Sequence, residues 1–324
     1  MPKNISHPDN PSMNSILAIA LADIHLSLNP PIARSGEIQW IESMDRQWRE
    51  VKALQHQHSP TMGEPLPVLI AGDIFDDGYK RDGSAVAPEL INLAIGMLPD
   101  RIYAVYGNHD LPGHNVENLR KSAYMTLVKA GKMIDLKPGK PVEVEGLPTP
   151  LRLRGFPYGT ELQPLEKHAT DAFFIDVAVV HRYCWVKGKG DHPKAKEEDR
   201  AKNLLASLAG FDVAVFGDNH IPFAFHQIAN CGGFYRRTTL EREHEPSVWL
   251  IHTDGTVVRH KLDCSKDLFI DHEATAETVV GGLEGFDEFI GEMNNLSDAA
   301  IDFGEALNRG MDESGCDNEV RVFV

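Results

Sequence analysis

The sequence contains few cysteines, no long hydrophobic run and no excess of basic residues. Its four cysteines form no CxxC pair, and a chain of 324 residues can bury enough surface to fold without disulfides. We therefore expect reduced thiols and a cytoplasmic protein. The longest clean apolar run, residues 16–22, is far shorter than the roughly 20 residues that a membrane-spanning helix needs. Residues 1–14 are polar and rich in Pro and Asn, and they do not resemble a signal peptide.

The deficit of basic residues is uneven along the chain. Lys and Arg number 32 against 48 Asp and Glu, which gives a net charge of −16. Residues 265–324 hold 15 acidic and three basic residues, so this segment carries −12 and the preceding 264 residues only −4. Overall acidity therefore does not exclude nucleic acid as a partner. Hydrophobic residues make up 42%, which excludes collagen-like and disordered chains.

Short apolar runs alternate with longer segments of helical spacing, a pattern typical of an α/β fold. Runs this short that remain apolar predict buried strands. The predicted strands are residues 16–22, 68–71, 102–106, 177–180 and 213–216. The predicted helices are residues 38–54, 86–98, 116–130 and 199–208. Residues 247–262 predict a β-hairpin with Asp254-Gly255 at its turn.

The acidic segment at the end of the chain also contains apolar residues such as Phe286, Phe289 and Leu307. We interpret residues 265–324 as a small helical appendage on a domain formed by residues 1–264. Because its charge repels phosphate groups, the appendage is expected to dock a partner protein or to pack as a lid on its own domain.

A basic, Gly- and Pro-containing loop is predicted at residues 187–196, with the sequence KGKGDHPKAK. It is either a solvated, mobile loop or a surface that contacts a phosphate backbone. Its position shortly after His181 keeps the second interpretation open.

Residues of metal-binding type follow each of the five predicted strands. Asp23 and His25 are two residues apart, and in an extended chain such side chains point to the same side and can share one ion. Asp73 has two carboxylate oxygens and can bridge two cations, whereas Asp76 and Asp77 are interpreted as turn residues or as supports for the ligands. A lone histidine after a strand is usually structural, but five such strand ends in a row are not explained that way. The other strand ends carry Asn108-His109-Asp110, His181 and Asp218-Asn219-His220.

In order and spacing these motifs resemble the calcineurin-like metallophosphoesterase superfamily, whose signature runs D-x-H, G-D-x-x-D, G-N-H-D/E, H and G-H-x-H. The resemblance covers residues 16–220 and implies a four-layer αββα sandwich. Within the superfamily, LADIHL, AGDIFDD and YGNHDLP are most similar to the SbcD-type nuclease subunits of double-strand-break repair complexes. The compact length and residues 230–251 are similar to short phage relatives, which implies the cytoplasm of a bacterial or phage-infected cell.

The resemblance also implies two divalent metal ions, Mn²⁺ or alternatively Mg²⁺. Asp218 departs from the family pattern, which has His there. As a ligand it lowers the formal charge of the site, whereas if it points away the second ion loses a ligand. His181 is assigned by its position at a strand end, although His168 and His192 lie nearby in sequence. The implied ligands are Asp23, His25, Asp73 and His220 for one ion, and Asp73, Asn108, His181 and Asp218 for the other.

The implied chemistry is hydrolysis of a phosphoester. Two divalent ions activate water for in-line attack on phosphorus. The resemblance implies that His109, oriented by Asp110, stabilises or protonates the leaving alkoxide. Both residues are therefore predicted to be catalytic.

Three functions remain open. The first is a DNA exo- or endonuclease that acts in recombination or repair with an SbcC-like ATPase; the motif spelling, the basic loop and Arg236-Arg237 favour it. The second is a phosphatase or small-molecule phosphodiesterase, which the acidic tail favours. The third is a binding subunit with a degenerate site, which only Asp218 favours. A homodimer is implied by the family alone; residues 38–54 supply either its interface or core packing.

Overall fold

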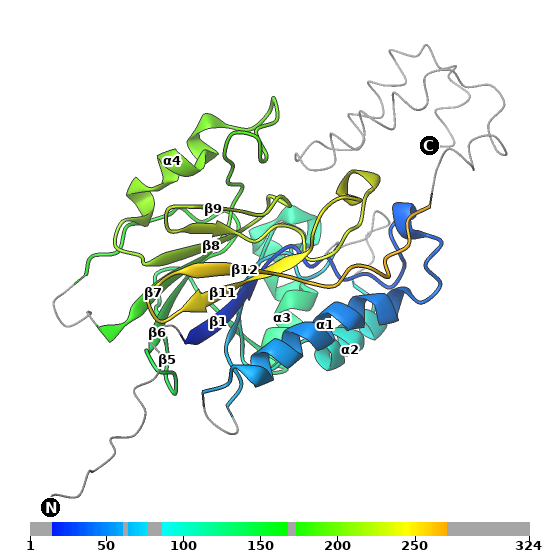
Figure 1. Cartoon of the computed structure of the whole chain (residues 1–324), viewed down its shortest axis with the longest axis horizontal. Helices are drawn as coiled ribbons and strands as arrows, with labels where there is room; N and C mark the ends of the chain where they lie inside the picture. The colour runs from blue at the N-terminus through cyan, green and yellow to red at the C-terminus, as the bar shows by residue number, and fades with distance from the viewer. Residues whose placement is uncertain (1–14, 61–63, 77–85, 168–172, 271–324) are drawn as a thin grey trace, which may run out of the picture. The chain divides into compact units, whose positions relative to one another are not determined.

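Two six-stranded sheets lie face to face between helices in the computed structural model (Figure 1). The structure describes residues 15–60, 64–76, 86–167 and 173–270. This architecture confirms the predicted α/β fold with its αββα layers. Within the described residues, no helix is both long and apolar enough to cross a membrane.

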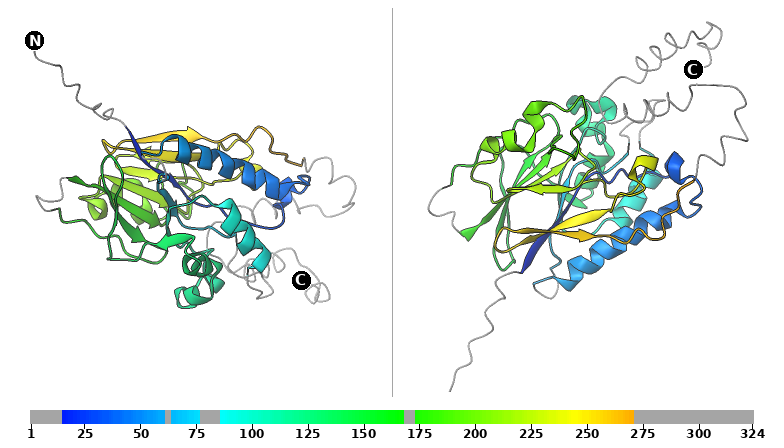
Figure 2. Two further views of the ribbon diagram at one scale, coloured as in Figure 1. Left: turned by 90° about the horizontal axis from the view of Figure 1, so that it is seen from below. Right: turned by 45° about the horizontal axis from the view of Figure 1, so that its top comes forward.

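The first sheet joins the early and late parts of the described chain. From one edge to the other it contains β12 (Val257–Lys261), β11 (Ser247–His252), β1 (Ile16–Leu21), β2 (Val68–Ala71), β3 (Ile102–Val105) and β4 (Met133–Asp135). β1 to β4 run parallel, and β11 pairs antiparallel with β1. Figure 2 shows the dark blue β1 beside the yellow and orange strands β11 and β12. The predicted hairpin is confirmed as β11 and β12.

The second sheet has a parallel centre and antiparallel edges. Its strands, in order, are β5 (Val142–Val144), β6 (Leu151–Phe156), β7 (Ile175–His181), β8 (Val213–Gly217), β10 (Ile228–Asn230) and β9 (Phe223–Phe225). The predicted strands 177–180 and 213–216 are confirmed as β7 and β8. The sequence analysis missed β4, β5, β6, β9 and β10, since four of them have three residues and β6 alternates apolar residues with arginine.

Helices cover the outer faces of both sheets (Figure 1). The first sheet carries α1 (Trp40–Gln57), α2 (Pro88–Met97) and α3 (Ala123–Lys129), and the second carries the short α4 (Ala201–Leu204). The single helix predicted for residues 116–130 is divided, because Ser122 is extended and its hydroxyl oxygen accepts a hydrogen bond from the Met125 amide as an N-cap. Residues 116–121 form a 3-10 helix instead. The predicted helix 199–208 likewise consists of short turns around α4.

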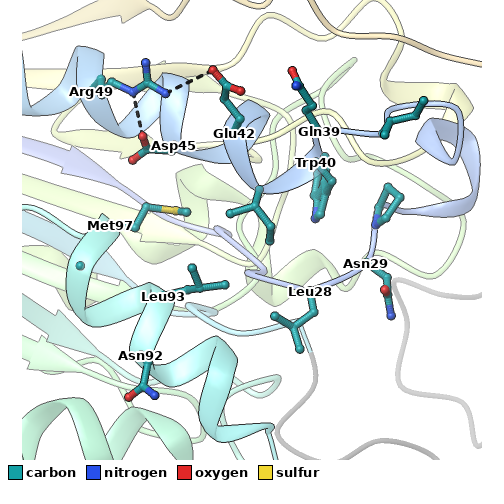
Figure 3. Close-up of a pocket in the computed structure, with 14 residues that line it drawn as sticks. Leu28, Asn29, Gln39, Trp40, Glu42, Asp45, Arg49, Asn92, Leu93 and Met97 are labelled. Atoms are coloured by element: carbon teal, nitrogen blue, oxygen red, sulfur yellow. Dashed lines mark hydrogen bonds and ion pairs between the residues drawn. The ribbon is translucent and has the colours of Figure 1, made fainter.

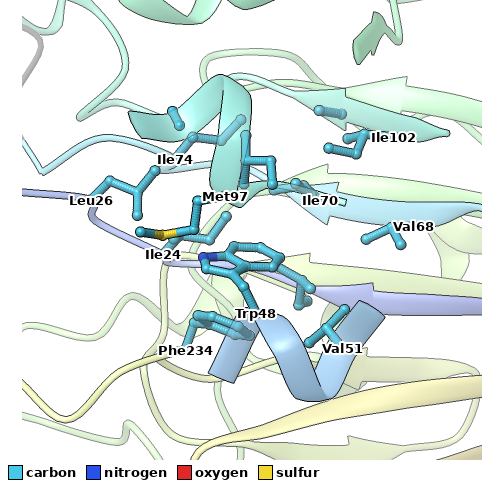
Figure 4. Close-up of a cluster of buried hydrophobic side chains, with 14 of the residues drawn as sticks. Ile24, Leu26, Trp48, Val51, Val68, Ile70, Ile74, Met97, Ile102 and Phe234 are labelled. Carbon is cyan, nitrogen blue, oxygen red and sulfur yellow. The ribbon is translucent and has the colours of Figure 1, made fainter. Parts of the chain in front are cut away.

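Alternate residues of each central strand pack into different cores. In β1, Ile19 and Leu21 belong to the core that contains α1, whereas Ala20 belongs to the core between the sheets. Central strands are therefore apolar on both faces, as expected of a parallel sheet that is covered on both sides. Trp48 of α1 is fully buried against the first sheet, with its ring centroid 4.5 Å from that of Phe234 (Figure 4). A buried Trp stabilises a fold by about 3–5 kcal/mol relative to Ala, so Trp48 anchors α1.

Residues 265–270 pack on the same compact unit as the sheets, and this unit extends to Ile270. The Asp267 side chain is buried at the centre of this contact. The predicted helical appendage is residues 265–324, and its part from residue 271 onward lies outside the described residues. A domain boundary after residue 264 therefore stays a prediction. The Asp267 carboxylate forms ion pairs with Arg34 (2.9 Å), Arg46 (2.6 Å) and Arg236 (2.9 Å).

Candidate metal centre

The seven predicted ligands meet where the carboxyl ends of parallel strands from both sheets come together. The carboxyl ends of parallel strands share one edge of a sheet, so residues far apart in sequence become neighbours. The structure therefore places all seven predicted residues in one region. They are Asp23 and His25 after β1, Asp73 after β2, Asn108 after β3, His181 at the end of β7, and Asp218 and His220 after β8.

Four of these residues have left-handed backbone conformations, with φ of 50° at Asp23, 49° at His25, 52° at Asp73 and 88° at Asp218. Such conformations cost roughly 1–3 kcal/mol each and persist only where the surrounding structure holds them. The backbone amides of Ile24 and His25 both donate to the carbonyl oxygen of Asp73, at 2.8 and 3.0 Å. These bonds fix the ends of β1 and β2 against each other and hold the strained residues in place.

Two motif glycines permit the close approach of the site residues. A Cβ atom on Gly72 would lie 2.1 Å from His181 Nδ1, and one on Gly107 would lie 2.0 Å from Asp73 Oδ1. Both distances are shorter than any allowed contact. A side chain at either position would therefore displace a predicted ligand, which explains why glycine precedes Asp73 and Asn108.

One group of candidate ligands consists of Asp23, His25 and His220, whose ligand atoms lie within 4.8 Å of one another. The Nε2 atoms of the two histidines are 3.3 Å apart. The Nδ1–H of His220 donates to Glu241 Oε1 at 3.2 Å, which leaves the Nε2 lone pair available for coordination. Without a cation, His25 Nε2–H donates to this lone pair, and a cation bound between the two nitrogens would take the place of that proton. The group therefore fits a divalent ion that accepts nitrogen and oxygen ligands.

A second group consists of Asp23, Asp73 and His181. The Nδ1–H of His181 donates to the carbonyl oxygen of Ala71 at 2.7 Å, so Nε2 is the nitrogen that faces the other predicted ligands. This Nε2 lies 3.4 Å from Asp73 Oδ2. Around the same nitrogen lie Asn108 Oδ1 at 3.0 Å and Asp218 Oδ1 at 4.0 Å. Asp218 thus faces this group rather than pointing away from it.

Of the neighbouring residues that competed for these roles, His192 lies elsewhere. His192 stands on the basic loop, with its ring centroid 5.4 Å from that of Tyr183. His168 and Asp77 lie outside the described residues. Of the three histidines considered, His181 is thus the one that the structure places among the other predicted ligands.

Burial and mutual repulsion dominate the electrostatics of the centre. Burial raises the pKa of Asp23 from its ordinary 3.8 to about 7, and it also raises the pKa of Asp218. Burial opposes ionisation of Asp73 too, but His181 beside it lowers the pKa of this carboxyl to about 2. Burial and the nearby Arg237 hold the pKa of His25 well below its usual range, so its ring is neutral. Burial opposes protonation of His181, but Asp73 beside it raises the pKa of His181 well above its usual range, so a cation bound at its Nε2 would displace a proton. Buried carboxylates and imidazoles together are the donor set of a dinuclear metal site.

The contact expected between His109 and Asp110 is corrected by the structure. The Nδ1–H of His109 donates to the carbonyl oxygen of Asp76 at 2.7 Å. The two Asp110 oxygens instead accept backbone N–H groups from Ile74 and Phe75 (2.9 and 3.1 Å) and from Gly107 (2.9 Å). Asp110 therefore ties the ends of β2 and β3 together, and the Asp76 backbone fixes the His109 ring. Sequence adjacency misled here, because neighbouring side chains in a turn point in different directions.

Glu241 is a functional candidate that the sequence motifs do not identify. Glu241 accepts from His220 and also from the backbone amides of Arg237 (2.7 Å) and Thr238 (2.8 Å). Burial of Glu241 opposes its ionisation, but the hydrogen bond from His220 lowers the pKa of Glu241 to about 2. Thr238 followed three residues later by Glu241 is a capping-box signal visible in the sequence. That signal predicts a helical turn, yet it cannot reveal the contact with His220.

A groove of about 780 Å³ lies between α1 and α2, away from the predicted ligands (Figure 3). Trp40, Leu93 and Met97 contribute apolar side chains to it. Arg49 at its rim pairs with Asp45 at 2.7 Å and with Glu42 at 3.9 Å. Among the described residues that line it, none is a predicted ligand, so the groove is separate from the metal centre.

Comparison with known proteins identifies the same region. A model of the family described as calcineurin-like phosphoesterase matches residues 17–222, a span that includes all seven predicted ligands. The sulfate thiohydrolase SoxB of Thermus thermophilus, solved in complex with glycerol, is similar at 12% sequence identity with a TM-score of 0.44. That similarity covers 83% of this chain and 60% of the SoxB chain. No curated protein matches the chain.

Proposed function

The chain belongs to the calcineurin-like phosphoesterase family and is a metal-dependent phosphoesterase; we propose that its substrate is DNA. In this proposal the protein is a nuclease subunit of recombination or repair, similar to SbcD-type subunits. The proposal is carried by one observation, the attachment of the basic loop to the metal centre.

The basic loop, residues 187–196, is tied to the residue that lies between two predicted ligands. Asn219 stands between Asp218 and His220, and its side-chain amide donates to the carbonyl oxygen of Lys189 in the loop at 3.5 Å and to that of Cys184, just before the loop, at 2.7 Å. The Tyr183 hydroxyl donates to the carbonyl oxygen of Gly190 at 2.8 Å. Lys187 and Lys194 are exposed on this loop. Cations held at a fixed place beside the centre suit a substrate whose phosphates continue beyond the cleaved bond.

The chain's own residues divide the chemistry in the following way. Divalent cations held by the seven ligands supply Lewis acidity toward the phosphoryl group. His109 holds a proton at Nδ1 through the Asp76 carbonyl, which leaves Nε2 as the atom that carries a proton to the leaving alkoxide. Asp110 acts as a positioning residue through its bonds to the backbone. Asp218 faces the second group of ligands, which favours an intact site over a degenerate binding subunit.

The proposed cations are Mn²⁺ or Mg²⁺. Four of the seven predicted ligands supply oxygen atoms: Asp23, Asp73, Asn108 and Asp218. Sites for softer metals are richer in sulfur and nitrogen ligands. Burial raises the pKa of the thiols of both Cys184 and Cys231, which disfavours the thiolate form that binds metals. Thiolate ligation therefore plays no part in the proposal.

The proposed partners are DNA, an SbcC-like ATPase and a second copy of the chain. The segment expected to dock the ATPase, residues 265–324, lies outside the described residues from residue 271 onward. A pull-down with and without residues 271–324 tests this partner. For the homodimer, Ile38 beside the groove is 98% exposed, so Ile38→Glu is expected to shift a dimer to monomer in sedimentation.

The substrate is tested with purified protein, Mn²⁺, end-labelled single- and double-stranded DNA, and a generic phosphomonoester in parallel. Loss of DNA cleavage in Asp73→Ala assigns the activity to this site. Replacing both Lys187 and Lys194 by Gln is expected to lower the slope of log affinity for DNA against log salt by about 2. Lys129 and Lys261, exposed on other elements, provide the matched control pair. Monoester cleavage without DNA cleavage would favour the phosphatase alternative instead.

A further inference from the structure

We propose that Arg237 forms an oxyanion-binding subsite at the metal centre, which holds a nonbridging oxygen of the phosphoester substrate in place of the Asp76 carboxylate. This inference rests on the phosphoester substrate class and adds a residue that lies outside the family motifs. It commits to a ligand chemistry, a phosphoryl or other tetrahedral oxyanion.

The guanidinium of Arg237 lies directly beside the candidate catalytic residues. Its Nη2 forms an ion pair with Asp76 Oδ1. The same Asp76 oxygen is 3.6 Å from His25 Nδ1, and the backbone carbonyl of Asp76 accepts from His109. Asp76 thus lies between Arg237 and both His25, a predicted ligand, and His109, the predicted proton donor.

The hydrogen-bonding edge of this guanidinium is only half used. Nη2 donates to Asp76, whereas Nε is buried and has no hydrogen-bond partner among the described residues. Arginine presents Nε–H and Nη2–H as a parallel pair, and this pair matches two oxygens of a phosphate. A buried donor without an acceptor is costly, and a bidentate oxyanion would remove that cost. The half-used edge therefore favours an anionic ligand with two oxygens, one for Nε–H and one for Nη2–H, where Asp76 supplies only one.

The position of the pair also suits exchange with a substrate. The His25 and Asp73 side chains are each 2% exposed, whereas the Asp76 side chain is 40% exposed. Asp76 can thus move into water at little cost when an oxyanion takes its place. The Arg237 side chain is itself 19% exposed, so the pair can be reached from solvent.

The backbone holds Arg237 in register with the ligands. Its amide donates to Glu241 Oε2 at 2.7 Å, and the other oxygen of that carboxylate accepts from His220. The preceding residue, Arg236, is fully engaged with Asp267 and with the carbonyl oxygens of Cys264 and Arg242. Of the two adjacent arginines, Arg236 therefore supports the fold and Arg237 remains available for a ligand.

The test is calorimetric titration of inorganic phosphate into the full-length protein saturated with Mn²⁺. Arg237→Gln is expected to weaken phosphate binding by roughly 10- to 100-fold, while the affinity for Mn²⁺ changes less than about twofold. Arg237→Lys, which keeps the charge without the paired donors, is expected to recover only part of the loss. Arg49→Gln, on the exposed face of α1, is the matched control and is expected to bind phosphate as the wild type does.

A double-mutant cycle separates a direct contact from a general effect of charge. Asp76→Asn removes the competing carboxylate and is expected to strengthen phosphate binding by roughly threefold or more. Adding Arg237→Gln to it abolishes that gain if the oxyanion sits on Arg237. A gain that persists in the double variant would overturn the subsite, as would wild-type phosphate affinity in Arg237→Gln or a parallel loss of Mn²⁺ affinity. Failure of the wild type to cleave DNA, with phosphate binding as expected, would refute the DNA proposal and leave the subsite standing.

Discussion

The cluster around Asp267 and the metal centre are both buried and both charged, yet their charges are arranged in opposite ways. Asp267 lies among three arginines, within 2.6–2.9 Å of each, and one of them, Arg34, also pairs with Glu37. In the metal centre, the carboxylates of Asp23 and Asp73 lie together with the imidazole nitrogens of His25, His181 and His220. The first cluster is complete within the protein, and the second requires positive charge from outside it.

The backbone shows the same difference. Asp267 has no left-handed conformation, whereas Asp23, His25, Asp73 and Asp218 all have positive φ. Strain and unbalanced charge are costs that a protein retains where a ligand will offset them. We therefore assign the Asp267 cluster to stability and the metal centre to function. Each prediction below separates these two assignments by a substitution in one cluster.

The largest effect is expected from Asp73→Asn, which removes a carboxylate from the centre of the ligand set. Phosphodiester cleavage is expected to fall by roughly 10³-fold or more, because several kcal/mol of charge stabilisation are lost. The increase in melting temperature on adding Mn²⁺ is expected to vanish as well. Asp100→Asn, at an exposed carboxylate, is the control and keeps both properties. Cleavage by Asp73→Asn within tenfold of the wild type would refute this role.

The next effect is expected from Asp267→Asn, measured by urea unfolding. Removing this acceptor leaves buried arginines without their carboxylate, so the free energy of unfolding is expected to fall by about 3 kcal/mol. The stabilisation produced by Mn²⁺ should remain as in the wild type. Glu198→Gln breaks an exposed ion pair with Lys196 and should change stability little. If Asp267→Asn abolished the Mn²⁺ effect, the separation of the two clusters would be wrong.

A smaller effect is expected from Glu241→Gln, which weakens the support of His220 without removing a ligand. Loss of the carboxylate makes the His220 imidazole a weaker electron-pair donor to the metal, and Mn²⁺ affinity is expected to fall roughly 10- to 100-fold. Calorimetric titration measures this change, with Glu245→Gln, an exposed pair with Lys261, as the control. Equal Mn²⁺ affinities in the two variants would show that Glu241 acts on the fold alone.

The smallest effect is a pH dependence of the metal-free protein. The pKa of Asp23 is raised from 3.8 to about 7, so the folded state holds this proton more tightly than the unfolded state. The contribution to stability is therefore present below about pH 4 and is lost as pH rises to about 7. Between about pH 5 and about pH 6, wild type should lose about 1 kcal/mol relative to Asp23→Asn. Parallel stability curves for the two proteins would contradict the raised pKa.

The sequence predicts the residues at the strand ends better than it predicts the short strands and the hydrogen-bond partners that hold those residues in place. The strands that precede Asp23 and Asp73 are continuous apolar runs, so both the strands and the turns after them are visible locally. Three-residue strands such as β5 and β9 depend on pairing with a neighbour, which a local pattern does not contain. The partners of His220 and of Asp267 likewise lie 21 or more residues away. Contacts of this kind are fixed by tertiary packing, and only the structure reveals them.

The central claim, that this centre binds two divalent cations, is tested most directly by the stoichiometry of Mn²⁺. Equilibrium dialysis of wild type and Asp73→Asn, with bound metal quantified by mass spectrometry, measures it without reference to any substrate. We predict two Mn²⁺ ions per chain for the wild type and fewer for the variant, because Asp73 groups with Asp23 and His181 and also with His25 and His109. One ion or none in the wild type, or equal stoichiometry in the two proteins, would contradict the account.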